Sequence, residues 1–307
     1  MLNERLADKL RREVANIDVR ESEPMSAHTT FKIGGPADLF CLPDSADTLR
    51  ELLLWARAEG EPVFALGGGS NLLVRDGGVR GVVVSTAKLT KIERIEDTWL
   101  EAECGVPLAK LASYARDCSL SGLEFAQGIP GSVGGGVYMN AGAYGGSLEQ
   151  SVRETDALSA DGKAVTVRGG EHAFGYRKSC FADGGTVLRT RIQLTRGDRD
   201  EIAAQMEDYR ERRRSTQPLE YPSAGSAFKR PPGLFAGKLI QDSGLKGARV
   251  GGAQVSEKHA GFIINTGGAT ASDVLGLIEK IQIEVFRQFG VMLESEIRVI
   301  GEDEQIG

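Results

Sequence analysis

The chain has 307 residues, 41% of them hydrophobic, which is enough for two domains or for one large fold with subdomains. Its formal net charge of −6 provides no overall positive field, so a nucleic-acid backbone and an anionic membrane are excluded as partners. The N-terminus lacks the apolar core of a signal peptide, and no apolar run approaches membrane-spanning length. We therefore expect a cytoplasmic protein without membrane insertion, and a monomer is the simplest oligomeric state.

The cysteines and histidines are too scattered to form a recognisable site. No two cysteines make a Cys-x-x-Cys pair, so reduced, mostly buried thiols are a simpler interpretation than a zinc ribbon or a redox dithiol. The histidines form neither a metal-ligand pattern nor part of a Ser-His-Asp triad. These residues are Cys41, Cys104, Cys118, Cys180, His28, His172 and His259. We predict no metal site.

The first 120 residues alternate helices and strands in our prediction. An amphipathic helix is expected over residues 2–14, where leucines and Val14 recur at helical spacing. A second helix is expected over 45–57, with Ser45 as its N-cap and Gly60 closing its end. Apolar runs predict strands at 62–66, 72–74, 81–84 and 100–103, and a further helix is expected over 107–118.

The second half again mixes both element types, so the fold class is α+β. Strands are expected at 155–159, 163–167 and 186–194, before a charged helix over 198–214 and a domain boundary near residue 200. The helix dipole favours the basic residues that close this helix, so a solvated face is preferred there over a ligand site. Beyond it we expect a loop at 223–229, helices over 233–243 and 272–289, and strands at 260–265 and 296–300, with Ser272 as the cap and Gly290 after the end of the last helix.

A run of small residues, Gly67-Gly68-Gly69-Ser70-Asn71, separates two of the predicted strands. Without side chains, the glycines would let a phosphate reach successive backbone N–H groups, and Ser70 and Asn71 add polar side chains. A plain tight turn explains the same residues equally well. The Gly-x-Gly-x-x-Gly dinucleotide turn and the P-loop are both absent from the sequence, so a bound nucleotide would be held differently.

A second glycine-rich segment, Gly122 to Gly146, holds nine glycines in 25 residues together with large apolar side chains. A flexible linker would not carry such groups. Its centre, Gly128 to Gly135, contains Pro130, which restricts the turn, while the glycines admit a ligand. We favour ligand binding over a purely structural loop.

Two further segments could carry chemistry. Arg177 follows an aromatic residue and could hold a carboxylate through two hydrogen bonds, although a surface salt bridge is the more ordinary interpretation. Ser226 lies among small residues, with Lys229 and Arg230 three and four positions later. This arrangement suits an exposed hydroxyl in a positive field, and a simple loop with a capping serine is an equal alternative.

Taken together, six blocks resemble the UDP-N-acetylenolpyruvoylglucosamine reductase family over nearly the whole chain. They occur in the family's order and approximate spacing, which makes chance agreement remote. The blocks are Thr-Phe-Lys-Ile-Gly-Gly at 30–35, the first glycine run at 66–73, the second at 128–143, Tyr-Arg at 176–177, the serine segment at 223–229 and Leu-Glu-Ser-Glu-Ile-Arg at 293–298.

The resemblance implies an FAD-binding fold of the vanillyl-alcohol oxidase type, built from two subdomains, followed by a C-terminal α+β substrate domain. The corresponding boundaries are 1–200, with subdomains of about 15–85 and 86–200, and 201–307. FAD is the implied cofactor and NADPH the co-substrate. The implied cofactor-binding residues are Gly67, Gly68, Gly69, Ser70, Asn71, Leu72, Gly128, Pro130, Gly131, Ser132, Gly134, Gly135, Asn140, Ala141 and Gly142.

The family's three catalytic positions fall on Arg177, Ser226 and Glu296. The resemblance implies that the hydride passes from flavin N5 to the enolpyruvyl group of a UDP-sugar, giving UDP-N-acetylmuramate for peptidoglycan precursor synthesis. Arg177 would stabilise the enolate, Ser226 would protonate the carbon with help from a cation such as Lys229, and Glu296 would lie on the other side of the enolate.

The implied substrate-binding residues are Tyr176, Lys229, Lys246, His259 and Arg298. The chain has no room between Arg177 and residue 200 for the inserted tyrosine loop of one family form, so it resembles the shorter form. Two alternatives remain open. Another flavoenzyme of the same fold, such as a sugar or alcohol oxidase, would share the glycine runs, and a noncatalytic nucleotide-sugar sensor would keep the pocket.

Overall fold

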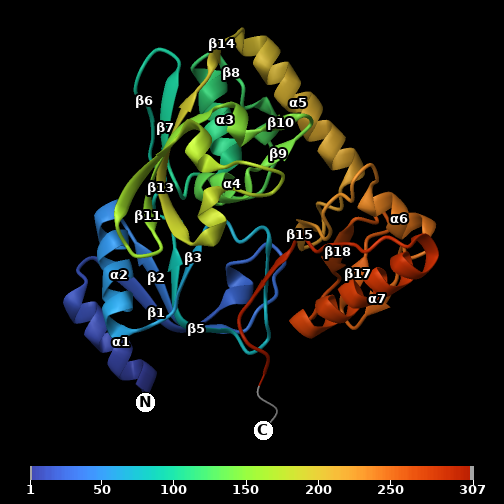
Figure 1. The fold of residues 1–307 in the computed structure, drawn as a ribbon, viewed down its shortest axis with the longest axis horizontal. Coiled ribbons are helices and arrows are strands. Elements are labelled where there is room, and N and C mark those ends of the chain that lie inside the picture. The colour runs from blue at the N-terminus through green and yellow to red at the C-terminus, as the bar shows by residue number, and fades with distance from the viewer. Residues whose placement is uncertain (1, 305–307) are drawn as a thin grey trace. The chain divides into compact units, whose positions relative to one another are not determined.

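The computed structural model describes residues 2–304, and its contacts divide the chain into two compact units (Figure 1). The first unit comprises the chain up to Glu21, Leu39–Gly68 and Val82–Arg213. The second comprises Ser22–Asp38, Gly69–Gly81 and the chain from Arg214 onward. Each unit has its own core of buried apolar side chains. Helices and strands occur in both, which confirms the predicted α+β class.

The N-terminal elements follow the predicted pattern closely. Helix α1 (Leu2–Glu13) buries Leu10 and is followed by the buried Val14. Helix α2 (Ala46–Glu59) starts after Ser45, whose hydroxyl accepts a hydrogen bond from the Thr48 N–H at 3.1 Å. The helix ends at Gly60, which has a left-handed φ of 74°. Both predicted ends of this helix are therefore confirmed, because cap chemistry is local.

Two sheets and their helices make up most of the first unit's secondary structure. One sheet has the strand order β1-β2-β5-β3, and β3 runs parallel to β5. The other has the order β12-β11-β13-β7-β6, and helices α3 and α4 lie beside it (Figure 1). The bounds are β1 Ile17–Pro24, β2 Pro36–Pro43, β3 Val63–Leu66, β5 Val79–Ser85, β6 Ile92–Arg94, β7 Trp99–Glu103, α3 Leu108–Asp117, α4 Val133–Met139, β11 Val152–Ser159, β12 Ala164–Arg168 and β13 Gly185–Gln193.

Shorter pairs and the long helix α5 complete this unit. Strand β8 (Leu120–Ser121) pairs with β14 (Thr195–Arg196), and β9 (Gly142–Ala143) pairs with β10 (Gly146–Ser147). Helix α5 (Arg199–Thr216) runs from the first unit into the second.

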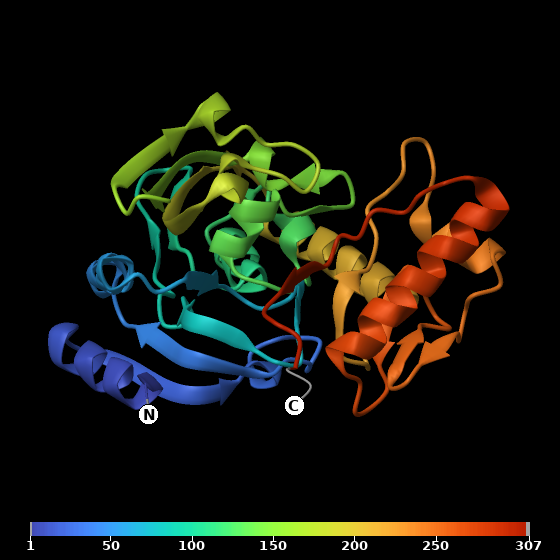
Figure 2. The same cartoon turned by 60° about the horizontal axis from the view of Figure 1, so that its bottom comes forward.

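The second unit is a four-stranded antiparallel sheet covered by helix α7 (Ala271–Phe289), which crosses one face of the sheet in Figure 2. The strand order is β15-β18-β17-β16, with β15 Ser223–Ser226, β16 Arg249–Val250, β17 Ala253–Val255 and β18 Phe262–Asn265. Helix α6 (Ala236–Asp242) packs against α7, and strand β19 (Arg298–Ile300) pairs in parallel with β4 (Leu72–Val74).

Several predicted elements were wrong in detail. The segment at 223–229 begins as strand β15, because its backbone pairs with β18. The glycine-rich segment contains helix α4, which was not predicted from its three consecutive glycines. A side chain at Gly136 would lie 3.0 Å from Leu148, so close packing outweighs the low helix propensity of glycine here.

Helix α7 begins one residue earlier than predicted, and its N-cap is Thr270 where Ser272 was expected. The Thr270 hydroxyl accepts a hydrogen bond from the Asp273 N–H at 3.0 Å. Ser272 lies in the first turn, and its N–H and hydroxyl both donate to Asp76. Asp76 also accepts from the Ala271 N–H at 2.7 Å. A residue far away in sequence thus completes the cap.

All four cysteines are free thiols, two of them buried and two half-buried. Burial raises the pKa of Cys41 and of Cys104 to about 12, because the charged thiolate is poorly solvated there. These two thiols are therefore unreactive core residues, as the sequence suggested.

Candidate active site

Gly67 and Gly68 of the first glycine run meet the second run inside the first unit. A Cβ atom at Gly67 would lie 2.5 Å from the Ser132 hydroxyl, and one at Gly68 would lie 2.7 Å from the Gly131 Cα atom. Any larger residue would force the two loops apart. Segments more than sixty residues apart in sequence thus pack directly on each other.

The second glycine run is held firmly in place. The Gly131 carbonyl accepts from the Leu108 N–H at 3.0 Å, and the Gly134 N–H donates to the Cys104 carbonyl at 2.8 Å. Just before the run, the Oε1 atom of Gln127 is buried, and no donor among the described residues reaches it. A buried acceptor without a donor is costly unless a ligand or water supplies one. Gln127 was not predicted as a site residue, although it directly precedes the glycine run.

Arg177 lies in a tight turn that is anchored to the second glycine segment. Its backbone has a left-handed φ of 55°, and its guanidinium donates to the Gly142 carbonyl at 3.4 Å. The guanidinium lies 5.3 Å from the centre of the Tyr176 ring. Tyr176 itself is 56% exposed. The side chain of Asn140 donates to the Gly175 carbonyl at 3.1 Å. Gly142 and Tyr176 therefore contact this arginine, and Asn140 anchors its turn; all three were predicted to bind FAD or substrate.

Ser226 and Glu296 lie on adjacent segments of the second unit. The Glu296 N–H donates to the carbonyl of Ala227 at 2.9 Å, one residue after Ser226. The pairing continues with an antiparallel bridge between Phe228 and Ser295. Ser226 is exposed and Glu296 half-buried. The structure thus brings these two predicted catalytic residues to the same place in the fold.

The first glycine run is linked to the Glu296 segment as well. The Asn71 side-chain amide donates to the Glu296 carbonyl at 3.0 Å, and the Asn71 carbonyl accepts from the Arg298 N–H at 3.0 Å. Both sides of the Glu296 peptide backbone are therefore held by hydrogen bonds. This link was not predicted, because a hydrogen bond across 225 positions leaves no local signal.

The predicted substrate residues of the second unit are polar and accessible. Lys229 forms an ion pair with Glu294. His259 is half-buried, and its Nδ1 atom accepts from the Gly261 N–H at 3.1 Å. Burial, and to a lesser degree the charge of Lys246, lower the pKa of His259. Lys246 and His259 are thus close enough to influence each other, whereas Arg298 is exposed on strand β19.

Models of two domain families match the chain. One, described as FAD binding domain, matches residues 37–167, and the other, described as UDP-N-acetylenolpyruvoylglucosamine reductase, C-terminal domain, matches residues 217–300. The chain is 49% identical to the UDP-N-acetylenolpyruvoylglucosamine reductase of Caldanaerobacter subterraneus subsp. tengcongensis over 97% of its length and 98% of the relative's. The chain belongs to the UDP-N-acetylenolpyruvoylglucosamine reductase family.

Other members support the same family membership. The enzyme of that name from Pediococcus pentosaceus is 46% identical over 99% of this chain and all of the relative. The crystal structure of the Thermus caldophilus reductase matches with a TM-score of 0.79 and 36% identity, covering 92% of this chain and 98% of that one. An alkyldihydroxyacetonephosphate synthase, with a TM-score of 0.50 and 13% identity over 63% of this chain and 40% of that one, shares the fold alone.

Membership of the family makes this protein an FAD-dependent oxidoreductase, and the predicted FAD-binding fold is confirmed. The geometry of the first unit fits FAD. Gly68 and Gly135 of these runs are exposed, and Gln127 offers a buried acceptor beside them. Among residues 2–304, no helix is long and apolar enough to cross a membrane.

Proposed function

We propose that this protein reduces UDP-N-acetylglucosamine enolpyruvate to UDP-N-acetylmuramate, with NADPH as the electron donor, in cytoplasmic peptidoglycan precursor synthesis. The observation that carries the proposal is the backbone pairing that puts Ser226 beside Glu296, with Asn71 of the first glycine run bonded to the same segment. An exposed hydroxyl and a carboxyl next to a cofactor loop suit proton delivery during a reduction. The division into an FAD-binding part, 1–200, and a substrate-binding part, 201–307, belongs to this proposal.

When bound, FAD would supply the chemistry of hydride transfer between NADPH and the substrate. We assign its binding to the residues of the two glycine runs. The small residues of the runs allow a pyrophosphate to approach backbone N–H groups, and Gln127 adds an acceptor for a donor group of the cofactor. Because Gly67 and Gly68 pack on Ser132 and Gly131, the two runs act as one binding surface.

Arg177 would hold the substrate carboxylate and stabilise the negative charge that develops next to it. A guanidinium can offer two parallel hydrogen bonds to a carboxylate, and its charge remains fixed throughout the reaction. The Gly142 carbonyl and the Tyr176 ring already orient this side chain. A preoriented cation loses little entropy when the substrate binds, which favours stabilisation of the transition state.

Ser226 would donate the proton to the substrate carbon, and Glu296 would face it across the reacting group. The Ser226 hydroxyl lies at the exposed end of β15, so a ligand can reach it. Its position relative to Glu296 is fixed by main-chain hydrogen bonds and not by flexible side chains. Lys229, which forms an ion pair with Glu294, is also assigned to substrate binding in this proposal.

Tyr176, Lys246, His259 and Arg298 complete the proposed contacts to the UDP-sugar. Lys246 and Arg298 supply positive charge for the diphosphate in a chain whose overall charge is −6. His259 would contribute its Nε2 atom as a neutral donor, because its Nδ1 atom accepts from Gly261 and its lowered pKa disfavours the charged form.

A two-step anaerobic experiment tests the proposal. The purified yellow protein should bleach with NADPH and regain its colour when UDP-N-acetylglucosamine enolpyruvate is added. Bleaching that only oxygen reverses would instead favour an oxidase of the same fold. A protein that binds the sugar nucleotide without any colour change would be a sensor and not a reductase.

A further inference from the structure

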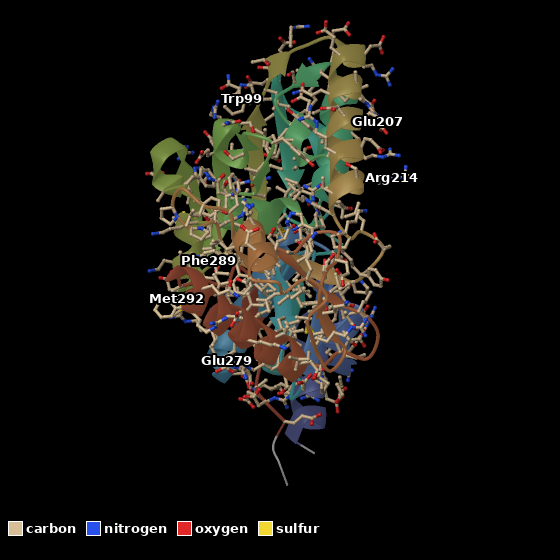
Figure 3. The ribbon with its side chains drawn as sticks, turned by 90° about the vertical axis from the view of Figure 1, so that its right-hand side faces the viewer. Trp99, Glu207, Arg214, Glu279, Phe289 and Met292 are labelled. Atoms are coloured by element: carbon tan, nitrogen blue, oxygen red, sulfur yellow. The ribbon has the colours of Figure 1, made fainter. Side chains whose placement is uncertain are left out.

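The turn that carries Arg177 draws its support from other parts of the first unit. Arginine side chains are long and flexible, so an exposed one can adopt many rotamers. Arg214, near the end of helix α5 in Figure 3, is exposed in this way, whereas Arg177 is half-buried. A guanidinium that holds a carboxylate through two hydrogen bonds must stay in position, and so must the backbone that carries it. The groups that fix this backbone therefore matter for substrate binding.

Tyr176 and Arg177 form the tip of a two-residue hairpin. Gly175 and Lys178 pair in the antiparallel sense at its base, with N···O distances of 3.0 and 3.2 Å. The Gly175 carbonyl closes the turn, because it accepts from the Lys178 N–H. Arg177 has a left-handed φ of 55°, a conformation that residues with a side chain disfavour. Such a turn keeps its shape only where the surrounding structure holds it.

The same Gly175 carbonyl is held a second time, by the side chain of Asn140. The Nδ2 atom of Asn140 donates to this carbonyl at 3.1 Å and to Oε2 of Glu149 at 2.9 Å. Both hydrogens of the amide are thereby used. The Oδ1 atom of Asn140 accepts from the Glu149 N–H at 3.1 Å. Glu149 thus binds both ends of the amide, and only one orientation of the amide suits these partners.

These contacts give the side chain of Asn140 a different part from the expected one. Asn140 was expected to bind FAD, but both of its amide hydrogens are engaged within the protein, so a group of FAD would have to displace one of these bonds. Glu149 was not predicted as a site residue. Its Oε1 atom accepts from the Ser147 hydroxyl at 3.2 Å, which leaves Oε2 directed at Asn140.

We propose that Glu149 is a positioning residue for the reduction: it orients the amide of Asn140, which in turn holds the Arg177 hairpin in place for the substrate carboxylate. This inference rests on the proposed function, since that function assigns Arg177 to the carboxylate. Glu149 acts only through Asn140 and the hairpin backbone, so it is not a catalytic residue.

The base of the hairpin has anchors that do not involve Glu149. The hydroxyl of Ser179, which is fully buried, donates to the Tyr138 carbonyl at 2.8 Å. On the other side, the ring of Phe174 stacks on His172, with ring centroids 4.8 Å apart. Removing the exposed side chain of Glu149 should therefore loosen the tip of the hairpin and leave the fold intact.

Stopped-flow kinetics on the FAD-loaded full chain test the role of Glu149. Glu149→Ala should slow reoxidation of the reduced flavin by UDP-N-acetylglucosamine enolpyruvate about tenfold, because the guanidinium is misplaced, and should slow reduction by NADPH much less. Glu149→Gln keeps an oxygen that can accept from Asn140, so it should restore most of the rate. Gln150→Ala is the matched control: Gln150 is the next residue of the same helical turn, bonds to the Gly145 carbonyl, and should be dispensable. Retained flavin colour and circular dichroism show that each variant is folded.

Asn140→Gly decides whether Glu149 acts through Asn140. Glycine accepts the left-handed φ of 44° at this position and removes the amide. Adding Glu149→Ala to this variant should cause no further loss of rate, because the amide that Glu149 orients is gone. FAD retention in Asn140→Gly should stay near that of the wild type.

Each possible failure has its own meaning. Wild-type reoxidation in Glu149→Ala would overturn this inference alone, and so would losses that add in the double variant. Strong loss of FAD from Asn140→Gly would also overturn it, because the amide would then be a ligand of the cofactor. A wild-type protein that the enolpyruvyl sugar nucleotide does not reoxidise would overturn the proposed function and this inference together.

Discussion

The side-chain amide of Asn71 donates a hydrogen bond to the backbone carbonyl of Glu296 at 3.0 Å. Asn71 belongs to the first glycine run, which we assign to FAD, and Glu296 is one of the proposed catalytic residues. The Glu296 N–H is bonded on its other side to Ala227, next to Ser226. One residue of the proposed cofactor loop therefore helps to set the position of the proposed catalytic segment.

We expect Asn71→Ala to slow reoxidation of the reduced flavin by substrate by roughly tenfold or more, which corresponds to about 1.4 kcal/mol. The loss of the hydrogen bond lets the Glu296 segment shift. Flavin reduction by NADPH should slow less, and stopped-flow absorbance separates the two half-reactions. Asn71→Asp keeps the side-chain size but removes the donor, so it should behave like the alanine variant. Wild-type reoxidation in Asn71→Asp would show that this hydrogen bond has no functional role.

Gly68→Ala should reduce FAD retention, because the new Cβ atom would lie 2.7 Å from the Gly131 Cα atom and would push the two glycine runs apart. We expect at least a tenfold weaker FAD affinity, about 1.4 kcal/mol, measured by flavin fluorescence during dialysis. Gly170→Ala is the control, since a Cβ atom there meets nothing within 4 Å. Equal FAD retention in both variants would contradict the proposed binding surface.

Ser226→Ala should leave flavin reduction by NADPH largely intact while lowering product formation by about 10²- to 10⁴-fold, the usual range for a lost general acid. Stability should change little, since Ser226 is exposed. Ser223→Ala, on the same strand, serves as the control and should retain activity. An equal loss in both half-reactions would argue against proton donation by Ser226.

His172 should make the first unit less stable as the pH falls. It is fully buried, with Nδ1 at 2.9 Å from the Gly169 carbonyl and Nε2 at 2.9 Å from the Thr155 hydroxyl. Burial lowers the pKa of His172 below its ordinary value of 6.5. The unfolded chain therefore binds a proton first as the pH drops through 6.5, and the free energy of unfolding decreases.

Urea unfolding at several pH values between about 7.5 and 5.5 measures this effect. In His172→Gln the decrease with falling pH should be shallower than in the wild type, because the remaining titratable groups are unchanged. Parallel pH profiles for the two proteins would mean that His172 does not contribute.

Local chemistry determined those elements that were predicted correctly. Ser45 and Gly60 mark the ends of α2 through hydrogen bonding and backbone freedom of their own, so no distant partner is needed to recognise them. Strand β1 carries no such signal, because it is mostly polar and exposed, and it was not predicted. The cap of α7 was misplaced because Asp76, almost two hundred residues earlier, holds Ser272.

The candidate site likewise has some features that the sequence predicted and others that depend on distant contacts. The sequence by itself determined the family resemblance, the two glycine runs and the types of residue available for catalysis, since these depend on identity and order along the chain. Only the tertiary structure decided that the glycine runs pack on each other and that Asn71 and Ala227 hold the Glu296 backbone from two sides. The physical reason is that such contacts join residues tens to hundreds of positions apart, and no periodicity or cap motif encodes them. In sequence, Glu296 resembles any surface glutamate, and its neighbours become visible only when the backbone is folded.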